Sequence, residues 1–165
     1  MTQITALLHT ANDGLRLGRA LETLLPFAEI LIVDHHSADM TIRIAREYGA
    51  RIVAAEDNAV AADYLVLARH DWIFCIDPSE SITEGLQASL FEWAALPSYD
   101  GEGGVAGGRA FSVCVREQIR KHWTDLPIPE TRLIPRTWSR WRRRLPAPES
   151  SAIPLEGELL RFALP

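Results

Sequence analysis

The sequence contains little cysteine and no long apolar segment. Its two cysteines, Cys75 and Cys114, belong to no CxxC or Cys/His spacing. We therefore expect neither a zinc site nor a disulfide framework, and interpret both as small core residues of a reduced, cytoplasmic protein. No apolar run approaches the roughly 20 residues that span a bilayer. The N-terminal stretch MTQITALLHTANDG has no basic segment before its apolar residues, so we expect no signal peptide.

The glycine-rich phosphate-binding motifs are missing as well. No GxxxxGK[ST] occurs, and the first expected strand-to-helix turn holds Asn12, Asp13 and Gly14 instead of GxGxxG. The sequence thus disfavours ATPases and nicotinamide-dependent dehydrogenases. What is present is an ordinary globular composition, 47% hydrophobic and 24% charged, in a chain whose length suits a single domain over residues 1–165.

Apolar runs alternate with helical spacings along the first 96 residues. The short apolar runs predict strands, and each is followed by a stretch that predicts a helix. The expected strands are 4–9, 29–34, 51–55 and 72–77, and the expected helices are 14–28, 38–50, 58–70 and 83–96. Four such units in a row favour the α/β class, with a mainly parallel sheet covered on both faces as an α/β/α sandwich.

This alternation ends at Pro97. Residues 97–108 are glycine-rich and predict a loop, whereas 109–116 alternate as a strand does. Six prolines between positions 127 and 154 oppose long helices, so we expect an irregular segment with short strands at 132–135 and 157–162. This tail is expected to fold onto the sheet as an appendage rather than to form a second domain.

Charge is distributed unevenly, although the net charge is only −5. Residues 1–108 carry six arginines against sixteen acidic residues, whereas 109–144 carry nine arginines and one lysine against three. The basic segment could pair with the acidic part of its own domain or meet a phosphate, an anionic membrane or a nucleic acid, and these alternatives stay open. The tryptophans and arginines of 136–144 favour a packed apolar patch with solvated arginines over a nucleic-acid surface.

Polar and acidic side chains gather where three of the expected strands end. The segments concerned are 9–13, 34–39 and 77–80. Ligands of open parallel sheets bind beyond the carboxyl ends of the strands, so these segments are expected to converge on one rim. A rim rich in carboxylates attracts a divalent cation and, through the cation, a phosphate.

Several of these residues also have a purely structural interpretation. Asp39 is expected to cap a helix, whereas Asp34, at a strand end, favours ligand contact. His35 and His36 are adjacent, point to opposite sides of an extended chain and lack partners at zinc-like spacing, so we interpret them as solvated. For Asp77, a metal ligand and a simple turn before Pro78 are both open.

The order of these motifs resembles that of family 2 glycosyltransferases, the inverting group with the GT-A fold, particularly bacterial members acting on lipopolysaccharide core. The family's T-x-N-E opening has its counterpart in Thr10-Ala11-Asn12-Asp13. Its D-x-x-S-x-D-x-T element is complete at Asp34, Ser37, Asp39 and Thr41. The resemblance covers residues 1 to about 96 and continues faintly to 132–141 and 157–162.

The resemblance implies a Rossmann-like GT-A domain, with nucleotide-binding βα repeats in 1–96 and an acceptor-side extension in 97–165. It implies that Asp34 and Asp39 face the base and ribose of a nucleotide-sugar. The implied nucleotide-binding residues are Thr10, Asn12, Asp13, Asp34, Ser37 and Asp39.

The family's D-A-D-E metal motif appears here as Asp77-Pro78-Ser79-Glu80, with Ser79 in place of the second Asp. The resemblance therefore implies Asp77, with Glu80 as a substitute, as ligands of Mg²⁺ or Mn²⁺ that stabilises the leaving diphosphate. Inverting transfer also needs a carboxylate base near the acceptor hydroxyl. The candidates for this base are Glu149, Asp100 and Glu102.

The sequence leaves three hypotheses about the function of the protein. The first is a cytoplasmic enzyme that moves sugar from a UDP-, GDP- or CDP-sugar to a glycan or lipid-linked acceptor of the bacterial cell envelope, with peripheral inner-membrane contact through 109–144. The second is a catalytically inactive nucleotide-sugar-binding or partner-regulating domain. It is supported by Ser79 and by the loss of the family's Arg-Asn pair around Ala62 and Asp63. The third, docking on nucleic acid or a membrane, rests on 109–144 alone.

Overall fold

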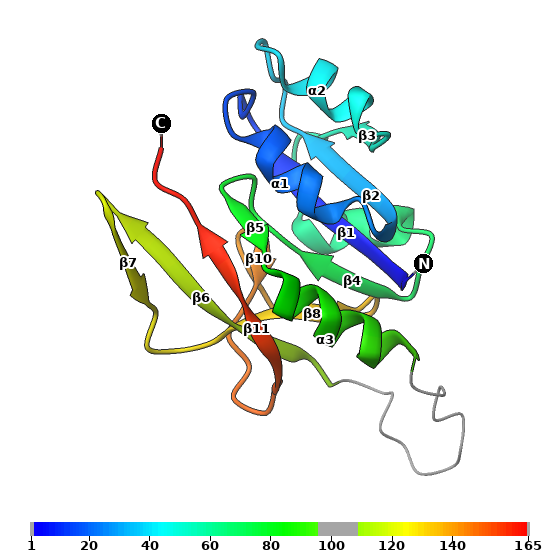
Figure 1. Cartoon of the computed structure of the whole chain (residues 1–165). Coiled ribbons are helices and arrows are strands. Elements are labelled where there is room, and N and C mark those ends of the chain that lie inside the picture. The colour runs from blue at the N-terminus through cyan, green and yellow to red at the C-terminus, as the bar shows by residue number, and fades with distance from the viewer. Residues whose placement is uncertain (1, 96–108, 165) are drawn as a thin grey trace.

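The structure is a computed structural model that describes residues 2–95 and 109–164. Within these residues, nine strands form one sheet in the order β3-β2-β1-β4-β8-β6-β11-β5, with β7 paired to β6 (Figure 1). The strands of this sheet are β1 (Thr2–Thr10), β2 (Phe27–Asp34), β3 (Arg51–Ala54), β4 (Trp72–Cys75), β5 (Glu80–Ile82), β6 (Phe111–Ile119), β7 (His122–Asp125), β8 (Glu130–Pro135) and β11 (Ile153–Arg161). The other elements are the hairpin of β9 (Trp141–Arg142) and β10 (Leu145–Pro146), the α-helices α1 (Leu17–Leu24), α2 (Thr41–Glu47) and α3 (Glu84–Ala95), and the 3₁₀ helix η1 (Ala61–Leu67).

The first four strands follow the predicted alternation. β1 pairs in parallel with β2 and with β4, and β2 pairs in parallel with β3. Parallel neighbours require crossover connections, which α1, α2 and η1 provide. The predicted α/β class is confirmed, with a large curled sheet at its centre.

Alternating side chains of the strands build two cores on opposite faces of the sheet. Ile4, Ala6 and Leu8 of β1 belong to the core that α1, α2 and α3 cover, whereas Leu7 belongs to the core beneath η1 and Trp138. Figure 1 shows α1 and α3 lying over the same face. Each fully buried aliphatic side chain contributes roughly 1.5–3 kcal/mol, so both layers stabilise the strand ends described below.

One predicted helix has a different form. The segment 58–70 was expected to be α-helical, but its regular part is the 3₁₀ helix η1. Ala61 and Tyr64 are buried against the sheet, and their spacing of three matches the three residues per turn of a 3₁₀ helix.

The C-terminal part contains more regular structure than predicted. β8 pairs antiparallel with β4 and β6, and β11 pairs parallel with β6, so these strands extend the sheet instead of lying on it. Gly157 has φ +89°, and a Cβ there would lie 2.1 Å from the Leu86 nitrogen, so only glycine lets β11 pass this close to α3. The predicted loop 97–108 lies outside the described residues.

The cysteine prediction is half correct. Cys75 is buried as expected, whereas Cys114 is exposed. Cys114 lies on β6 between the buried Val113 and Val115, so strand alternation turns its side chain to the opposite face. None of the helices in the described part of the chain has the length and apolar character that crossing a membrane requires.

Candidate functional site at the carboxyl ends of the parallel strands

The loops that follow β1 and β2 are joined by side-chain hydrogen bonds. Thr10 Oγ1 donates to Asp34 Oδ1 at 2.8 Å, and the Asn12 N–H donates to Ser37 Oγ at 2.8 Å. The Ala38 N–H in turn donates to Asn12 Oδ1 at 2.8 Å. The two loops are therefore held as one unit, although 24 to 26 residues separate the partners.

Two more bonds extend this unit to the turn that precedes α1 and to the start of α2. The Asp13 N–H donates to Thr41 Oγ1 at 2.8 Å, and the Gly14 N–H donates to Asp39 Oδ2 at 2.9 Å. Asp39 Oδ1 accepts the Thr41 N–H and hydroxyl at 2.9 and 2.5 Å. The cap position of α2 is Met40 rather than the predicted Asp39, although Asp39 still pairs the first amide of the helix.

We call Thr10, Asn12, Asp13, Asp34, Ser37, Asp39 and Thr41 the strand-end cluster. All six residues predicted to form a nucleotide pocket belong to it. Their spacing in the sequence is explained by the hydrogen bonds among them, which join the two loops. Their role in nucleotide binding stays a prediction.

Asp34 is the buried acceptor at the centre of the cluster. Besides Thr10, it accepts the Ser37 hydroxyl at 2.6 Å on Oδ1 and the Ser37 N–H at 2.9 Å on Oδ2. Burial raises the pKa of this carboxyl, but the hydrogen bonds from Ser37 and Thr10 outweigh it and hold the pKa below its usual range. Asp34 is thus ionised at neutral pH, and an ionised carboxylate accepts about four hydrogen bonds. Three of these sites are taken by donors from Thr10 and Ser37.

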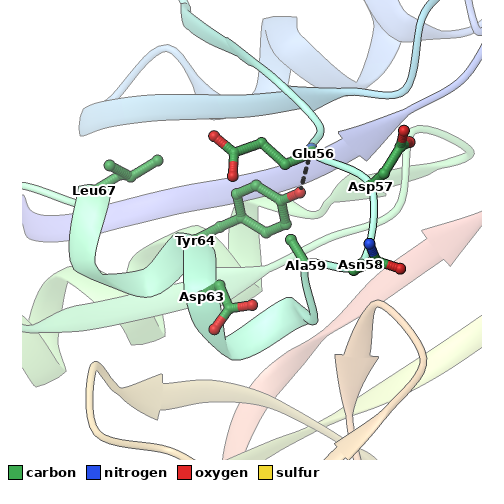
Figure 2. Close-up of a pocket in the computed structure, with 7 residues that line it drawn as sticks. All are labelled: Glu56, Asp57, Asn58, Ala59, Asp63, Tyr64 and Leu67. Atoms are coloured by element: carbon green, nitrogen blue, oxygen red, sulfur yellow. Dashed lines mark hydrogen bonds between the residues drawn. The ribbon is translucent and has the colours of Figure 1, made fainter.

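A pocket of about 370 Å³ lies at the carboxyl end of β3, the strand next to β2, and its lining includes no residue of the strand-end cluster. Asp34 pairs with Ala54 of β3, and its carbonyl accepts the Ala55 N–H at 2.8 Å, immediately before the pocket begins at Glu56. The lining residues are Glu56, Asp57, Asn58, Ala59, Asp63, Tyr64 and Leu67 (Figure 2). Three carboxylates make this wall rich in hydrogen-bond acceptors.

Tyr64 fixes the shape of this pocket and joins it to β1. Its hydroxyl accepts the Glu56 N–H at 2.9 Å, which ties η1 to the loop after β3 (Figure 2). The Tyr64 ring meets the His9 ring edge-on, with 5.6 Å between the ring centroids. The His9 ring in turn contacts the His35 ring, with 5.2 Å between the centroids. An aromatic stack therefore connects the ends of β1 and β2 with the pocket.

The two histidines of this stack share a hydrogen bond of 2.9 Å between His9 Nδ1 and His35 Nε2. Burial lowers the pKa of His9 to about 3, with further lowering by His35 and Arg144. Burial also lowers the pKa of His35, and Arg144 adds to that effect while Asp34 opposes it. Both rings are therefore neutral at pH 7. Of the pair predicted to be solvated, His36 is exposed, whereas His35 is held against His9.

The predicted metal motif lies on the other side of β1. β1 separates β2 from β4 in the sheet, so Asp77 and Asp34 are two strand spacings apart, on the order of 10 Å. Asp77 Oδ1 accepts the Ser79 N–H at 2.9 Å and the Ser79 hydroxyl at 2.6 Å. Ser79, which replaces the family's second carboxylate, thus closes a local turn on Asp77.

Glu80 is fully buried in an ion network. Arg132 donates to both of its carboxylate oxygens, at 2.7 and 2.8 Å, and Arg161 donates to Oε1 at 2.9 Å. The Asp77 N–H donates to Glu80 Oε2 at 3.0 Å. Arg132 and Arg161 also pair with Glu130, which completes the network.

These residues, as arranged, do not fit a Mg²⁺ or Mn²⁺ site. Divalent cations of this kind need several oxygen ligands that face one point. Glu80 is committed to two guanidinium groups, and within residues 2–95 and 109–164 there is no group of three His, Cys, Asp or Glu side chains that could hold a metal. Metal binding by Asp77 and Glu80 stays a prediction, and it requires Glu80 to leave its arginines.

Of the three candidate bases, the described residues include Glu149, whereas Asp100 and Glu102 lie outside them. Glu149 accepts the Ser151 hydroxyl at 2.8 Å and pairs with Arg140. Hydrogen bonds from Ser151 lower the pKa of Glu149, which makes it a weaker base in this conformation. Its catalytic role is a prediction that these contacts do not test.

The basic segment pairs in part with acids of its own chain. Arg132 forms an ion pair with Glu80, and Arg136 forms one with Asp71. Both acids lie in residues 1–108, the acidic part of the sequence. The interpretation of 136–144 as a packed patch is confirmed, because Trp138 is buried in the core beneath η1 while Arg142, Arg143 and Arg144 are exposed.

Sequence reasoning missed the pocket, the histidine pair and the buried network. The pocket residues Glu56 to Asp63 carried no motif, although three carboxylates in eight positions were visible. Glu80 and Arg132 are 52 residues apart, and no local sequence pattern predicts an ion pair between them. The histidine pair follows from the register of β1 and β2, which sequence periodicity does not provide.

Comparison with known proteins gives partial matches. A protein of Rickettsia bellii described as an uncharacterized glycosyltransferase is 30% identical over 92 residues, which cover 53% of this chain and 31% of that protein. A counterpart from Rickettsia prowazekii is 28% identical over 97 residues, covering 54% and 32%. The chain thus matches about a third of the length of these relatives. No family model matches the sequence.

Comparison with solved structures gives matches that cover more of the chain, at lower sequence identity. Glucosyl-3-phosphoglycerate synthase of Mycobacterium tuberculosis, in complex with Mn²⁺, UDP and glucosyl-3-phosphoglycerate, has a TM-score of 0.48 and 18% identity, over 71% of this chain and 44% of that one. Residues 1–349 of S. aureus TarS give a TM-score of 0.46 and 15% identity, over 73% and 36%. By sequence, about half of this mixed α/β chain is similar to bacterial proteins described as glycosyltransferases.

Proposed function

We propose that the chain binds a nucleoside-diphosphate sugar at the carboxyl ends of β1, β2 and β3 and transfers the sugar, with inversion, to a glycan or lipid-linked acceptor. The observation that carries this proposal is that the strand-end cluster and the 370 Å³ pocket lie at the carboxyl ends of neighbouring parallel strands, the cluster after β1 and β2 and the pocket after β3. The sequence similarity to bacterial proteins described as glycosyltransferases supports it. Placement within family 2, action on cell-envelope glycans, and a cytoplasmic site with peripheral membrane contact through 109–144 belong to the same proposal.

The pocket wall suits the base and ribose of a nucleotide. Uracil-type N–H groups and ribose hydroxyls are donors, and Glu56, Asp57 and Asp63 offer them carboxylate acceptors. Asp34 does not line this pocket, and it would add an ionised acceptor at the end of the neighbouring strand β2.

The proposed reaction is a displacement at the anomeric carbon. The acceptor hydroxyl attacks that carbon, the bond from the carbon to the diphosphate oxygen breaks, and a carboxylate takes the hydroxyl proton. Glu149, Asp100 and Glu102 remain the candidates for this base. The residues around Asp77, as arranged, do not fit a metal that could stabilise the leaving diphosphate.

The test is a panel of UDP-, GDP- and CDP-sugars, measured by thermal shift and by release of the nucleoside diphosphate. We expect one nucleotide class to stabilise the protein and to be turned over in the presence of an acceptor extract. Binding without release would support the inactive binding domain instead of the enzyme. No response to any of these nucleotides would overturn the proposal.

Two substitutions localise the binding. Asp34→Asn and Asp57→Asn are each expected to weaken nucleotide binding about tenfold or more, because a hydrogen bond to a charged group contributes roughly 1.5–3 kcal/mol. Asp57 is exposed, so the Asp57→Asn variant leaves intact the loops after β1 and β2, which Asp34 helps to join. Asp125→Asn on β7 removes one exposed carboxylate from an element outside the proposed site and is expected to bind as the wild type does.

A further inference from the structure

The turn of the β9–β10 hairpin presents three consecutive arginines. Leu145 pairs with Arg142, so Arg143 and Arg144 form a two-residue turn. Arg142, Arg143 and Arg144 are exposed, and none of them makes an ion pair with another residue of the described ranges. The hairpin thus carries three guanidinium groups without partners in the described structure.

This hairpin is braced at its base. The Trp138 indole N–H donates to the Arg140 carbonyl at 2.6 Å, and the Trp141 indole N–H donates to the Trp138 carbonyl at 3.2 Å. The Ala147 N–H donates to the Arg140 carbonyl at 3.0 Å, and Arg140 pairs with Glu149. The arginine turn therefore projects from a fixed support.

The residues that flank the turn place it on the face of the sheet that also carries the pocket wall. Trp141 and Leu145 pack against the same core as Val33, which precedes Asp34. Two residues of the pocket wall lie on the same core: Tyr64 belongs to it, and Ala59 packs against it. The hairpin and the pocket wall thus lie on the same face of the sheet.

The electrostatics of the rim are consistent with this position. Arg144 lowers the pKa of both His9 and His35, which shows that its charge acts at the carboxyl ends of β1 and β2. The pocket wall is acidic, whereas the turn is basic. A ligand with a neutral, donor-rich end and an anionic end would be oriented by this polarity.

We propose that the turn of Arg142, Arg143 and Arg144 binds the diphosphate of the nucleotide and that this binding needs no divalent cation. The inference rests on the proposed function and names the groups that compensate the diphosphate charge. Guanidinium groups bind phosphate oxygens through two parallel N–H donors, and they stay charged at any pH the protein tolerates. These arginines supply the positive charge that a metal bound at Asp77, Ser79 and Glu80 would otherwise supply. Glu80 is unavailable for a metal as arranged, because it is paired with Arg132 and Arg161.

The test measures binding of UDP, GDP and CDP, each beside its nucleoside, by calorimetry in EDTA and in Mn²⁺. For the wild type we expect the preferred nucleoside diphosphate to bind equally in both, with an affinity that falls steeply as salt rises. The double variant Arg142→Gln/Arg144→Gln is expected to lose about tenfold or more in affinity for the diphosphate, since hydrogen bonds to charged groups are lost. Its affinity for the nucleoside is expected to stay unchanged.

The chain offers a matched control at the β6–β7 turn. Arg120→Gln/Lys121→Gln removes two exposed positive charges from another hairpin, and Arg120 shares with Arg143 a backbone φ near +60°. This variant is expected to bind the diphosphate as the wild type does. An equal loss in both double variants would mean general electrostatic attraction and would overturn the inference.

The other outcomes separate the two proposals. Diphosphate binding that appears only with Mn²⁺ would overturn the inference and leave the proposed function standing. Loss of nucleoside binding in the hairpin variant would also overturn it, because the turn would then act on the fold or on the base. If the variant binds nucleotides normally but no longer binds phosphatidylglycerol vesicles, the turn is a membrane contact. No binding of any nucleotide or nucleoside under either condition would overturn both proposals.

Discussion

At the scale of single residues, His9 shows how burial alone changes the chemistry of a side chain. It is buried at the end of β1, and in the described structure its Nε2 has no hydrogen-bond partner. Its other nitrogen is bonded to His35, and Tyr64 covers its ring. Protonation would place an uncompensated charge there, with Arg144 adding to the repulsion, so the folded state holds the ring neutral.

This predicts a loss of stability in mild acid. The pKa of His9 is about 3 in the folded protein, against an ordinary value of about 6.5 when unfolded. Between these values the unfolded chain binds a proton that the folded chain does not, so stability is complete above about pH 6.5 and falls as the pH decreases. Lowering the pH from 7 to 5 is expected to cost about 2 kcal/mol through His9, measured by urea unfolding.

His9→Phe keeps an aromatic ring at this position and removes the titration. We expect the variant to lose clearly less stability than the wild type between pH 7 and 5, with a remainder from His35, whose pKa is also lowered. His122→Gln on β7 removes an exposed histidine and is expected to follow the wild type. Parallel curves for His9→Phe and the wild type would show that His9 is not the source.

At the scale of elements, Thr41 joins the start of α2 to the turn that precedes α1. Its fully buried hydroxyl accepts the Asp13 N–H at 2.8 Å and donates to Asp39. Thr41→Val keeps the shape but leaves the Asp13 N–H without a partner, which is expected to cost roughly 1–3 kcal/mol in the free energy of unfolding. Faster hydrogen exchange of the Asp13 amide is the local measurement.

The matched variant is Thr41→Ser, which keeps the hydroxyl and removes the methyl group. It is expected to preserve the slow exchange of the Asp13 amide, at the cost of a buried methyl group, about 1 kcal/mol. If the valine variant exchanged as slowly as the serine variant, the loops would be held by packing and not by this hydroxyl.

The elements also show what a sequence can predict. β1 to β4 were predictable because local periodicity and apolar runs determine buried parallel strands. The strand-end cluster was predictable as a set because its members share two short motifs. β8 and β11 were underestimated, since long-range pairing overrides the prolines at 135 and 154, which lie at a strand end and beside a register shift.

The site was less predictable than the fold for a physical reason. The pocket arises where the loop after β3 meets η1, and the 3₁₀ form of η1 was not expected from an alanine- and leucine-rich stretch. Glu80 was a predicted metal ligand from its place in the motif, but its environment is set by Arg132 and Arg161 from distant strands. A local motif identifies Glu80 as a candidate ligand, whereas the tertiary structure determines which side chains it pairs with.

At the scale of the whole molecule, the network around Glu80 connects the parallel and the antiparallel parts of the sheet. Glu80 begins β5, Arg132 lies on β8 and Arg161 ends β11. Arg132 also donates to the Cys75 carbonyl at the end of β4, at 3.1 Å. A fully buried ion pair is strongly destabilising when one partner is lost, because the other charge stays buried without compensation.

Glu80→Gln is therefore expected to cost about 3–5 kcal/mol in the free energy of unfolding, measured by urea denaturation without added metal. Glu117→Gln is the control, since Glu117 is a partly exposed partner of Arg161 at 3.6 Å, and its loss is expected to cost about 1 kcal/mol or less. Because Glu80 joins both parts of the sheet, hydrogen exchange in β1 and in β11 is expected to accelerate together. A small cost, or faster exchange confined to β5, would mean that the network does not couple the two parts. Glu80 would then be less firmly committed to its arginines than the structure indicates, and the predicted metal role would become the better explanation of its position.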